Sequence, residues 1–104
     1  MKNMTRSLLV LTAIVTFAGA MSFAQSGEAI YKAHCQSCHG ATGTPNPGIA
    51  KLLGVKAASD PSVKKMSVAE MEDVVKHGKN KMKPIAGLTD AQVHDVVMYF
   101  RTLE

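Results

Sequence analysis

Apolar residues recur at helical spacing in three separate segments of this chain. The first covers residues 27–35 and follows Ser26, a residue type that caps the first turn of a helix. The other two open with capping boxes, Ser67 to Glu70 and Thr89 to Gln92, in which a hydroxyl residue stands three positions before an acid or amide. We expect these helices to run to about residues 77 and 102.

The second and third helices each present one apolar face. In the second, four apolar residues fall at i, i+3, i+6 and i+7, namely Val68, Met71, Val74 and Val75. In the third, the spacing is i, i+3, i+4 and i+7, with Tyr99 on the flank, and the residues are Val93, Val96, Val97 and Phe100. Such faces predict helices that bury one side against a common core.

The segments between the helices are typical of loops. Residues 40–48 are rich in Gly, Pro, Thr and Asn, residues 55–63 allow one turn at most, and residues 79–87 are rich in lysine. Ile49, Leu52 and Leu53 are apolar residues able to cover a bound group, and Gly54 ends that segment. Because no segment alternates convincingly between apolar and polar residues, the predicted fold class is all-α.

The first 24 residues have the pattern of a secretory signal peptide. Lys2 and Arg6 precede an apolar run at residues 8–20, which is short for a membrane span. Small residues before Gln25 predict cleavage after Ala24, which leaves residues 25–104 as one exported domain. The alternative is an uncleaved N-terminal anchor.

Size and charge narrow the classes of function. A domain of about 80 residues, without tryptophan, buries too little apolar surface to be comfortable alone. Removal of Lys2 and Arg6 with the leader would lower the net charge from +4 to +2. With no basic stripe interleaved with aromatic residues, the sequence does not predict nucleic-acid binding.

Cys35-Gln36-Ser37-Cys38-His39 is the motif that carries the chemistry. Two thiols at this spacing can each add across a vinyl group of a haem, and the adjacent histidine can then ligate the iron. A thioredoxin-like dithiol would need a βαβ context. A structural zinc site usually needs four ligands, and the chain has only two cysteines. The motif therefore predicts one covalently bound haem c.

A metal-bound histidine usually donates its other ring N–H to a fixed acceptor such as a backbone carbonyl. Pro45 and Pro47, in the stiff loop after His39, are the two candidates for supplying that carbonyl. The loop alone does not decide between them.

The order of these features resembles the class I c-type cytochromes, particularly the small bacterial monohaem type. The resemblance covers essentially the whole chain after the leader. It implies that three to four helices wrap around one haem, and that the first and last helices cross closely. Gly27 and Tyr31 would meet Val96 and Tyr99 at that crossing. The spacing in that family also favours Pro47 over Pro45 as the partner of His39.

The resemblance further implies a methionine ligand on the second face of the haem. Met82 is isolated in the lysine-rich loop, where no helical core face explains a methionine. The usual Met-Pro pair of the family is here interrupted by Lys83, which puts the local loop geometry in question. The competing ligands are Met66, Met71, Met98, His77 and His94.

These residues predict a monomeric, periplasmic carrier of single electrons rather than an enzyme. Histidine and thioether ligation would leave no open iron position for a substrate and would favour Fe(II). The alternative is a ligand-binding or enzymatic haem protein with an open distal position. Lysines that flank Met82 would meet an acidic surface on a redox partner, and these are Lys76, Lys79, Lys81 and Lys83.

Overall fold

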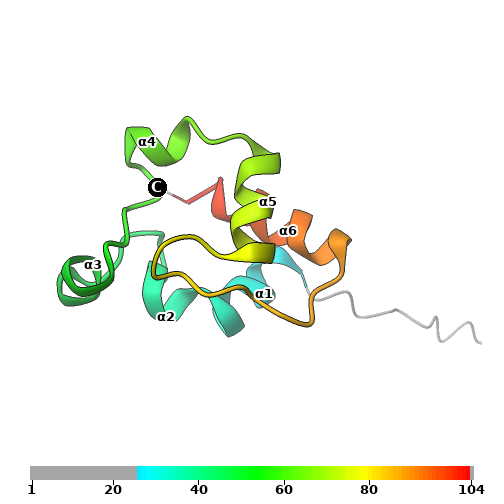
Figure 1. The fold of residues 1–104 in the computed structure, drawn as a ribbon, viewed down its shortest axis with the longest axis horizontal. Coiled ribbons are helices and arrows are strands. Elements are labelled where there is room, and N and C mark those ends of the chain that lie inside the picture. The colour runs from blue at the N-terminus through cyan, green and yellow to red at the C-terminus, as the bar shows by residue number, and fades with distance from the viewer. Residues whose placement is uncertain (1–25, 104) are drawn as a thin grey trace, which may run out of the picture.

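The computed structural model describes residues 26–103 and shows an all-α fold (Figure 1). The predicted leader and its cleavage site after Ala24 lie outside the described residues. Within these residues there are six helices, whereas three to four were expected. The additional ones, α2 and α4, are single turns of four residues each. The helices are α1 (Gly27–His34), α2 (Gln36–His39), α3 (Pro47–Leu53), α4 (Pro61–Lys64), α5 (Val68–His77) and α6 (Asp90–Phe100).

The predicted starts of the three longer helices are confirmed. The side chain of Ser26 accepts a hydrogen bond from the backbone of Ala29 at the start of α1. Thr89 and Gln92 form a reciprocal capping box on α6, with N···O distances of 3.2 and 2.8 Å. At the start of α5 only half of the box forms, because the carboxylate of Glu70 accepts from the hydroxyl of Ser67 instead of its backbone N–H.

Helix α3 begins inside a segment predicted as loop. The side chain of Asn46 accepts from the N–H of Gly48 at 2.8 Å, and Pro47 occupies the first turn, where its missing N–H costs nothing. Gly54 ends the helix in the left-handed region, at φ 68°. Helix α4 starts in the same way, with Asp60 as its cap and Pro61 in its first turn. An Asn-Pro or Asp-Pro pair therefore starts a helix here.

Helices α1 and α6, at the two ends of the described chain, cross at close range (Figure 1). A Cβ atom added to Gly27 would lie 2.1 Å from the carbonyl oxygen of Asp95, so only glycine allows this approach. The rings of Tyr31 and Tyr99 pack with centroids 5.3 Å apart. Tyr31 and Val96 also belong to one buried cluster. The crossing implied by the resemblance is confirmed.

The buried residues form two clusters that share α6. One joins α1 to α6 through Ile30, Tyr31 and Val96. The other joins α5 to α6, and its members are Met71, Val75, Val93 and Val97. Helix α3 has no buried residue and lies at one end of the molecule, apart from α5 and α6 (Figure 1). Within residues 26–103, no helix has the length and apolar character needed to cross a membrane.

Candidate cofactor site

A cavity of about 530 Å³ lies between the CxxCH segment, the end of α3, α5, α6 and the loop after α5. Its volume falls within the range of roughly 300–1,000 Å³ that is usual for ligand and cofactor sites. Cys35, Cys38, His39 and Met82, four of the predicted site residues, all lie on its wall. The fifth, Pro47, does not line it. The fold thus brings together groups that stand more than 40 positions apart in the sequence.

Apolar side chains from separate elements supply most of the remaining wall. They come from the end of α3, from α4, α5 and α6, and from the adjoining loops, and they include Leu53, Val55, Val63, Val75, Ile85, Val97 and Phe100. An apolar wall around a few polar groups is the composition expected of a site that takes a large flat cofactor.

The two cysteines lie in one helical turn. The carbonyl of Cys35 accepts from the backbone N–H of His39 at 2.9 Å, and α2 follows α1 almost without a break. Residues three positions apart on a helix share a face, so Cys35 and Cys38 point to the same side. Both are half-buried free thiols. Burial, followed by the neighbouring Cys38, raises the pKa of the Cys35 thiol to about 11.

His39 is held in an apolar environment. Its ring meets the ring of Phe100 edge-on, with centroids 5.5 Å apart and an interplanar angle of 74°. Burial lowers the pKa of the imidazole, which favours the neutral form that binds metals. Its Nδ1 atom is buried and has no hydrogen-bond partner among residues 26–103. A buried imidazole without a protein partner is rare and indicates a group that a cofactor completes.

The structure shows no hydrogen bond from the described residues to His39 Nδ1, so the pairing with Pro47 stays a prediction. Pro47 is exposed, whereas Pro45 is buried. The loop that carries both prolines folds back onto Gly40, the residue after the histidine. The approach is so close that a Cβ added to Gly40 would lie 2.0 Å from the carbonyl oxygen of Thr44. Gly40, at φ 82°, permits that approach.

Tyr31 connects the helix crossing to the CxxCH segment. Its hydroxyl donates to the carbonyl oxygen of Gly40 at 2.5 Å, and its side chain lines the cavity. Only 1% of the residue is exposed, and desolvation by burial is the main cause that raises the pKa of the phenol to about 12. Tyr31 therefore stays protonated and fixes the backbone directly after His39.

A tight turn fixes the backbone of Met82. Lys79 and Met82 exchange both backbone hydrogen bonds, at 3.0 and 2.9 Å, and form an isolated bridge. Asn80 has φ 53°, the single non-glycine residue in the left-handed region among those described. Gly78 is required beside the turn, since a Cβ there would lie 2.5 Å from the carbonyl oxygen of Met82. Ile85 then donates to the carbonyl of Val75 at 2.9 Å, which ties the loop to α5.

The structure separates the competing ligands. His77 and His94 lie outside the cavity, where their ring nitrogens pair with Asp73 and Glu72 at 2.8 and 2.9 Å. Met98 also lies outside it and is 43% exposed.

Two competing methionines do line the cavity. Met71 belongs to the α5–α6 core, and its sulfur lies 3.8 Å from an Arg101 nitrogen. Met66 packs against the same core. Both therefore have a packing role, whereas Met82 belongs to neither buried cluster.

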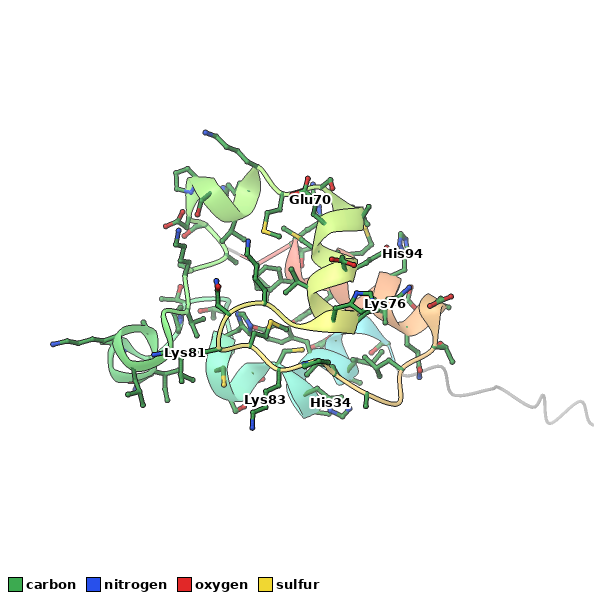
Figure 2. All side chains as sticks on the ribbon, viewed as in Figure 1. His34, Glu70, Lys76, Lys81, Lys83 and His94 are labelled. Atoms are coloured by element: carbon green, nitrogen blue, oxygen red, sulfur yellow. The ribbon has the colours of Figure 1, made fainter. Side chains whose placement is uncertain are left out.

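The lysines near Met82 differ in what they contact. Lys76 forms an ion pair of 2.8 Å with Asp90, and the ammonium of Lys81 donates to the carbonyl oxygen of Leu52 at 2.8 Å. Lys79 and Lys83 are exposed, and both line the rim of the cavity. Figure 2 shows Lys81 reaching towards α3, while Lys83 points away from it. The four lysines are thus not one uniform patch.

The sequence did not assign Phe100 or Asn80 to the site, and it assigned Lys81 only to the docking surface. Phe100 was recognised only as part of an apolar face, and its contact with His39 depends on how α6 crosses the chain. Asn80 carried a usable signal, because asparagine tolerates positive φ in turns. The contact of Lys81 with Leu52 joins residues 29 positions apart and has no local signal.

These residues fit a haem. Two thiols in one turn, a neutral buried imidazole with an orphaned nitrogen, and a thioether line the same apolar cavity. Sulfur and imidazole are also the groups that hold haem iron in cytochromes of the c type.

Comparisons with known proteins agree with this site. The family model described as cytochrome c oxidase, cbb3-type, subunit III, matches residues 22–100. A cytochrome c6 from Cyanidium caldarium is 33% identical over 76 residues, which are 72% of this chain and 66% of that protein, just under two thirds of its length.

Two solved structures share the fold. The KustC0563 c-type cytochrome has a TM-score of 0.66 and 28% identity, over 74% of this chain and 95% of that one. The dihydro-heme d1 dehydrogenase NirN has a TM-score of 0.60 and 30% identity, over 75% of this chain but only 16% of NirN. The chain therefore belongs to the matched cytochrome family and is a small class I c-type cytochrome.

Proposed function

We propose that this chain carries single electrons between redox partners outside the cytoplasmic membrane, with one haem c ligated by His39 and Met82. The observation that carries the proposal is the shared cavity, because Cys35, Cys38, His39 and Met82 all line it. A haem held there would supply an iron that accepts and releases one electron.

Each of these residues has a role that follows from its position. Cys35 and Cys38 would each form a thioether from one helical turn, which fixes the ring relative to α2. His39 would offer a neutral nitrogen, since burial lowers its pKa. Met82, held by its turn, would offer a thioether sulfur, which favours Fe(II) and raises the potential relative to two histidines. With His39 and Met82 as ligands in both oxidation states, electron transfer would need little rearrangement.

The test is the optical spectrum of the purified protein and of Met82→Ala. We expect a low-spin c-type spectrum with the weak near-infrared Met-to-iron band, and its loss in Met82→Ala together with a lower potential and faster cyanide binding. Met66→Ala is the matched control, because Met66 also lines the cavity. If Met66→Ala loses the band and Met82→Ala keeps it, the sixth ligand is Met66.

A second candidate function is haem-based ligand binding or catalysis with an open distal position. The likeness to part of NirN, a dihydro-heme d1 dehydrogenase, favours it. A high-spin resting spectrum, or carbon monoxide binding at the rate of a five-coordinate haem, would support this candidate. A resting protein that stays low-spin in both oxidation states and excludes carbon monoxide supports the carrier instead.

We further propose that residues 1–24 are a cleaved signal peptide and that the mature protein is a periplasmic monomer. The charged start and short apolar run support the leader, and attachment of haem c outside the membrane suits export. Intact-mass measurement of the holoprotein tests cleavage, since the expected N-terminus is Gln25. A mass that includes residues 1–24, in protein extracted with the membrane, would instead indicate an anchor.

The proposed partner has an acidic docking surface near the cavity rim. Lys79 and Lys83 carry this proposal, because both are exposed at the rim, whereas Lys81 contacts Leu52 and Lys76 pairs with Asp90. Clustered positive charge raises the encounter rate with an acidic partner more than the affinity, and salt screens it.

Charge reversal of both residues tests the docking surface. Lys79→Glu/Lys83→Glu should cut the rate of electron transfer at low salt while leaving the spectrum intact. Lys64→Glu/Lys65→Glu is the matched control, since these exposed lysines lie outside the haem cavity. A rate with the partner that is the same at low and high salt would leave the rim lysines as solubilising surface.

A further inference from the structure

Lys81 makes a contact that a solubilising surface lysine does not make. Its ammonium donates to the carbonyl oxygen of Leu52 at 2.8 Å, across 29 positions of sequence. Leu52 lies in the last turn of α3, where carbonyls have no partner within the helix. A cation at that end also interacts favourably with the helix dipole. Lys81 therefore caps a helix from a different part of the chain.

The contact joins two walls of the cavity. Leu53, at the end of α3, and Lys81, in the loop after α5, both line it. Helix α3 has no buried residue, and Leu52 is 66% exposed. Little apolar packing therefore holds α3 against the domain. Figure 2 shows Lys81 between the loop and α3. The hydrogen bond is a specific tie between these two elements.

Lys81 is also coupled to Met82 through the backbone. The two residues are neighbours in the turn that Lys79 and Met82 close with two hydrogen bonds. Asn80, at φ 53°, holds the turn in a conformation that most residues disfavour. With its backbone in this turn and its side chain on α3, Lys81 limits how far the turn can move from the cavity.

We propose that Lys81 is a positioning residue that ties the Met82 turn to the end of α3 and so keeps Met82 over the cavity. The proposal rests on the proposed ligation of iron by Met82. It assigns Lys81 a different role from Lys79 and Lys83, whose charges face outward at the rim. Loss of the Lys81 side chain should free the turn without changing the proposed covalent attachment of haem at Cys35 and Cys38.

The experiment compares Lys81→Ala, Lys81→Arg and Lys83→Ala in the holoprotein. Two quantities are measured: amide hydrogen exchange at Lys79 and Met82, whose N–H groups close the turn, and the binding rate of imidazole to the ferric haem. In Lys81→Ala we expect the amide exchange rate and the imidazole binding rate each to rise about tenfold, because the variant loses a hydrogen bond from a charged group. Lys81→Arg keeps a cationic donor and should restore both towards the original values. Lys83→Ala should leave both unchanged.

The two readouts separate this proposal from the proposed function. Amide exchange in the turn reports the tie whatever ligates the iron, whereas the spectrum of Met82→Ala reports the ligand. Equal exchange in Lys81→Ala and Lys83→Ala would overturn the role of Lys81. Failure of Lys81→Arg to restore slow exchange would also overturn it, because the ammonium contact with Leu52 would then not be the cause.

Discussion

The α1–α6 crossing and the Met82 side of the cavity show two ways in which a small domain is held together. At the crossing, side chains fill the space completely: Ile30 is fully buried, and a Cβ on Gly27 would already clash. On the Met82 side, α3 has no buried residue and the turn is held by hydrogen bonds. Between the two regions lies the cavity of about 530 Å³.

Protein atoms fill the core at the crossing, whereas on the Met82 side they leave a cavity. Interiors of folded proteins are close-packed, so an apolar cavity of this size is costly unless a cofactor fills it. Side chains of the polypeptide itself pack the crossing. A haem in this cavity would bury apolar surface on the Met82 side, and the cofactor would then be part of the core.

Helix α6 belongs to both regions. Val96 joins the cluster with Tyr31, and Val97 joins the cluster with Met71, while both valines line the cavity. Phe100 meets the rings of Tyr31 and His39. Helix α6 therefore contacts both the crossing and His39, the proposed iron ligand, so the packing at the crossing helps to fix where Phe100 meets the imidazole.

Loss of haem attachment should have the largest effect. Cys35→Ser/Cys38→Ser removes both thioethers, and we expect a chain that loses haem in denaturant and has little stable helix, because the cavity would lack its filling. Circular dichroism and haem retention in denaturant measure this. Ser37→Ala, an exposed position in the same motif, is the control. A stable, helical, haem-free domain from the double variant would show that the protein core suffices alone.

Disruption of the crossing should come next. Gly27→Ala places a methyl group 2.1 Å from the carbonyl oxygen of Asp95, and we expect a loss of about 3 kcal/mol in the free energy of unfolding with an unchanged haem spectrum. Denaturant titration measures it. Gly48→Ala is the matched control, because a Cβ there meets only the side chain of Asn46, at 3.2 Å. Equal stability of the two variants would mean that the crossing relaxes to accept a methyl group.

The smallest effect should come from the hydrogen bond that joins the crossing to the CxxCH segment. Tyr31→Phe removes the hydrogen bond to Gly40 and should cost about 1 kcal/mol. Because burial raises the pKa of Tyr31 from 10.0 to about 12, the unfolded state releases its proton first as pH rises.

The contribution of the protonated Tyr31 hydroxyl to the free energy of unfolding is full below pH 10.0 and is lost towards pH 12. The difference in unfolding free energy between the original protein and Tyr31→Phe should therefore shrink over that interval. Tyr99→Phe, which changes the neighbouring ring, is the control. A constant difference would show that Tyr31 does not titrate with the fold.

Local signals in the sequence determined the features that depend on a few neighbouring residues. The caps at Ser26 and Thr89 predicted their helices because the capping hydrogen bonds span three residues. The CxxCH motif predicted thiols on one face beside a histidine for the same reason, since one turn contains all three. The close crossing at Gly27 was anticipated only through the resemblance to a family.

Tertiary structure alone decided how distant segments meet at the site. Phe100 lies against His39 because α6 crosses the chain at a particular angle and depth, and Lys81 reaches Leu52 because the loop after α5 returns to the end of α3. The start of α3 at Pro47 was missed because proline favours both loops and the first turn of a helix. Such contacts depend on packing between elements, which residue patterns within one element do not encode.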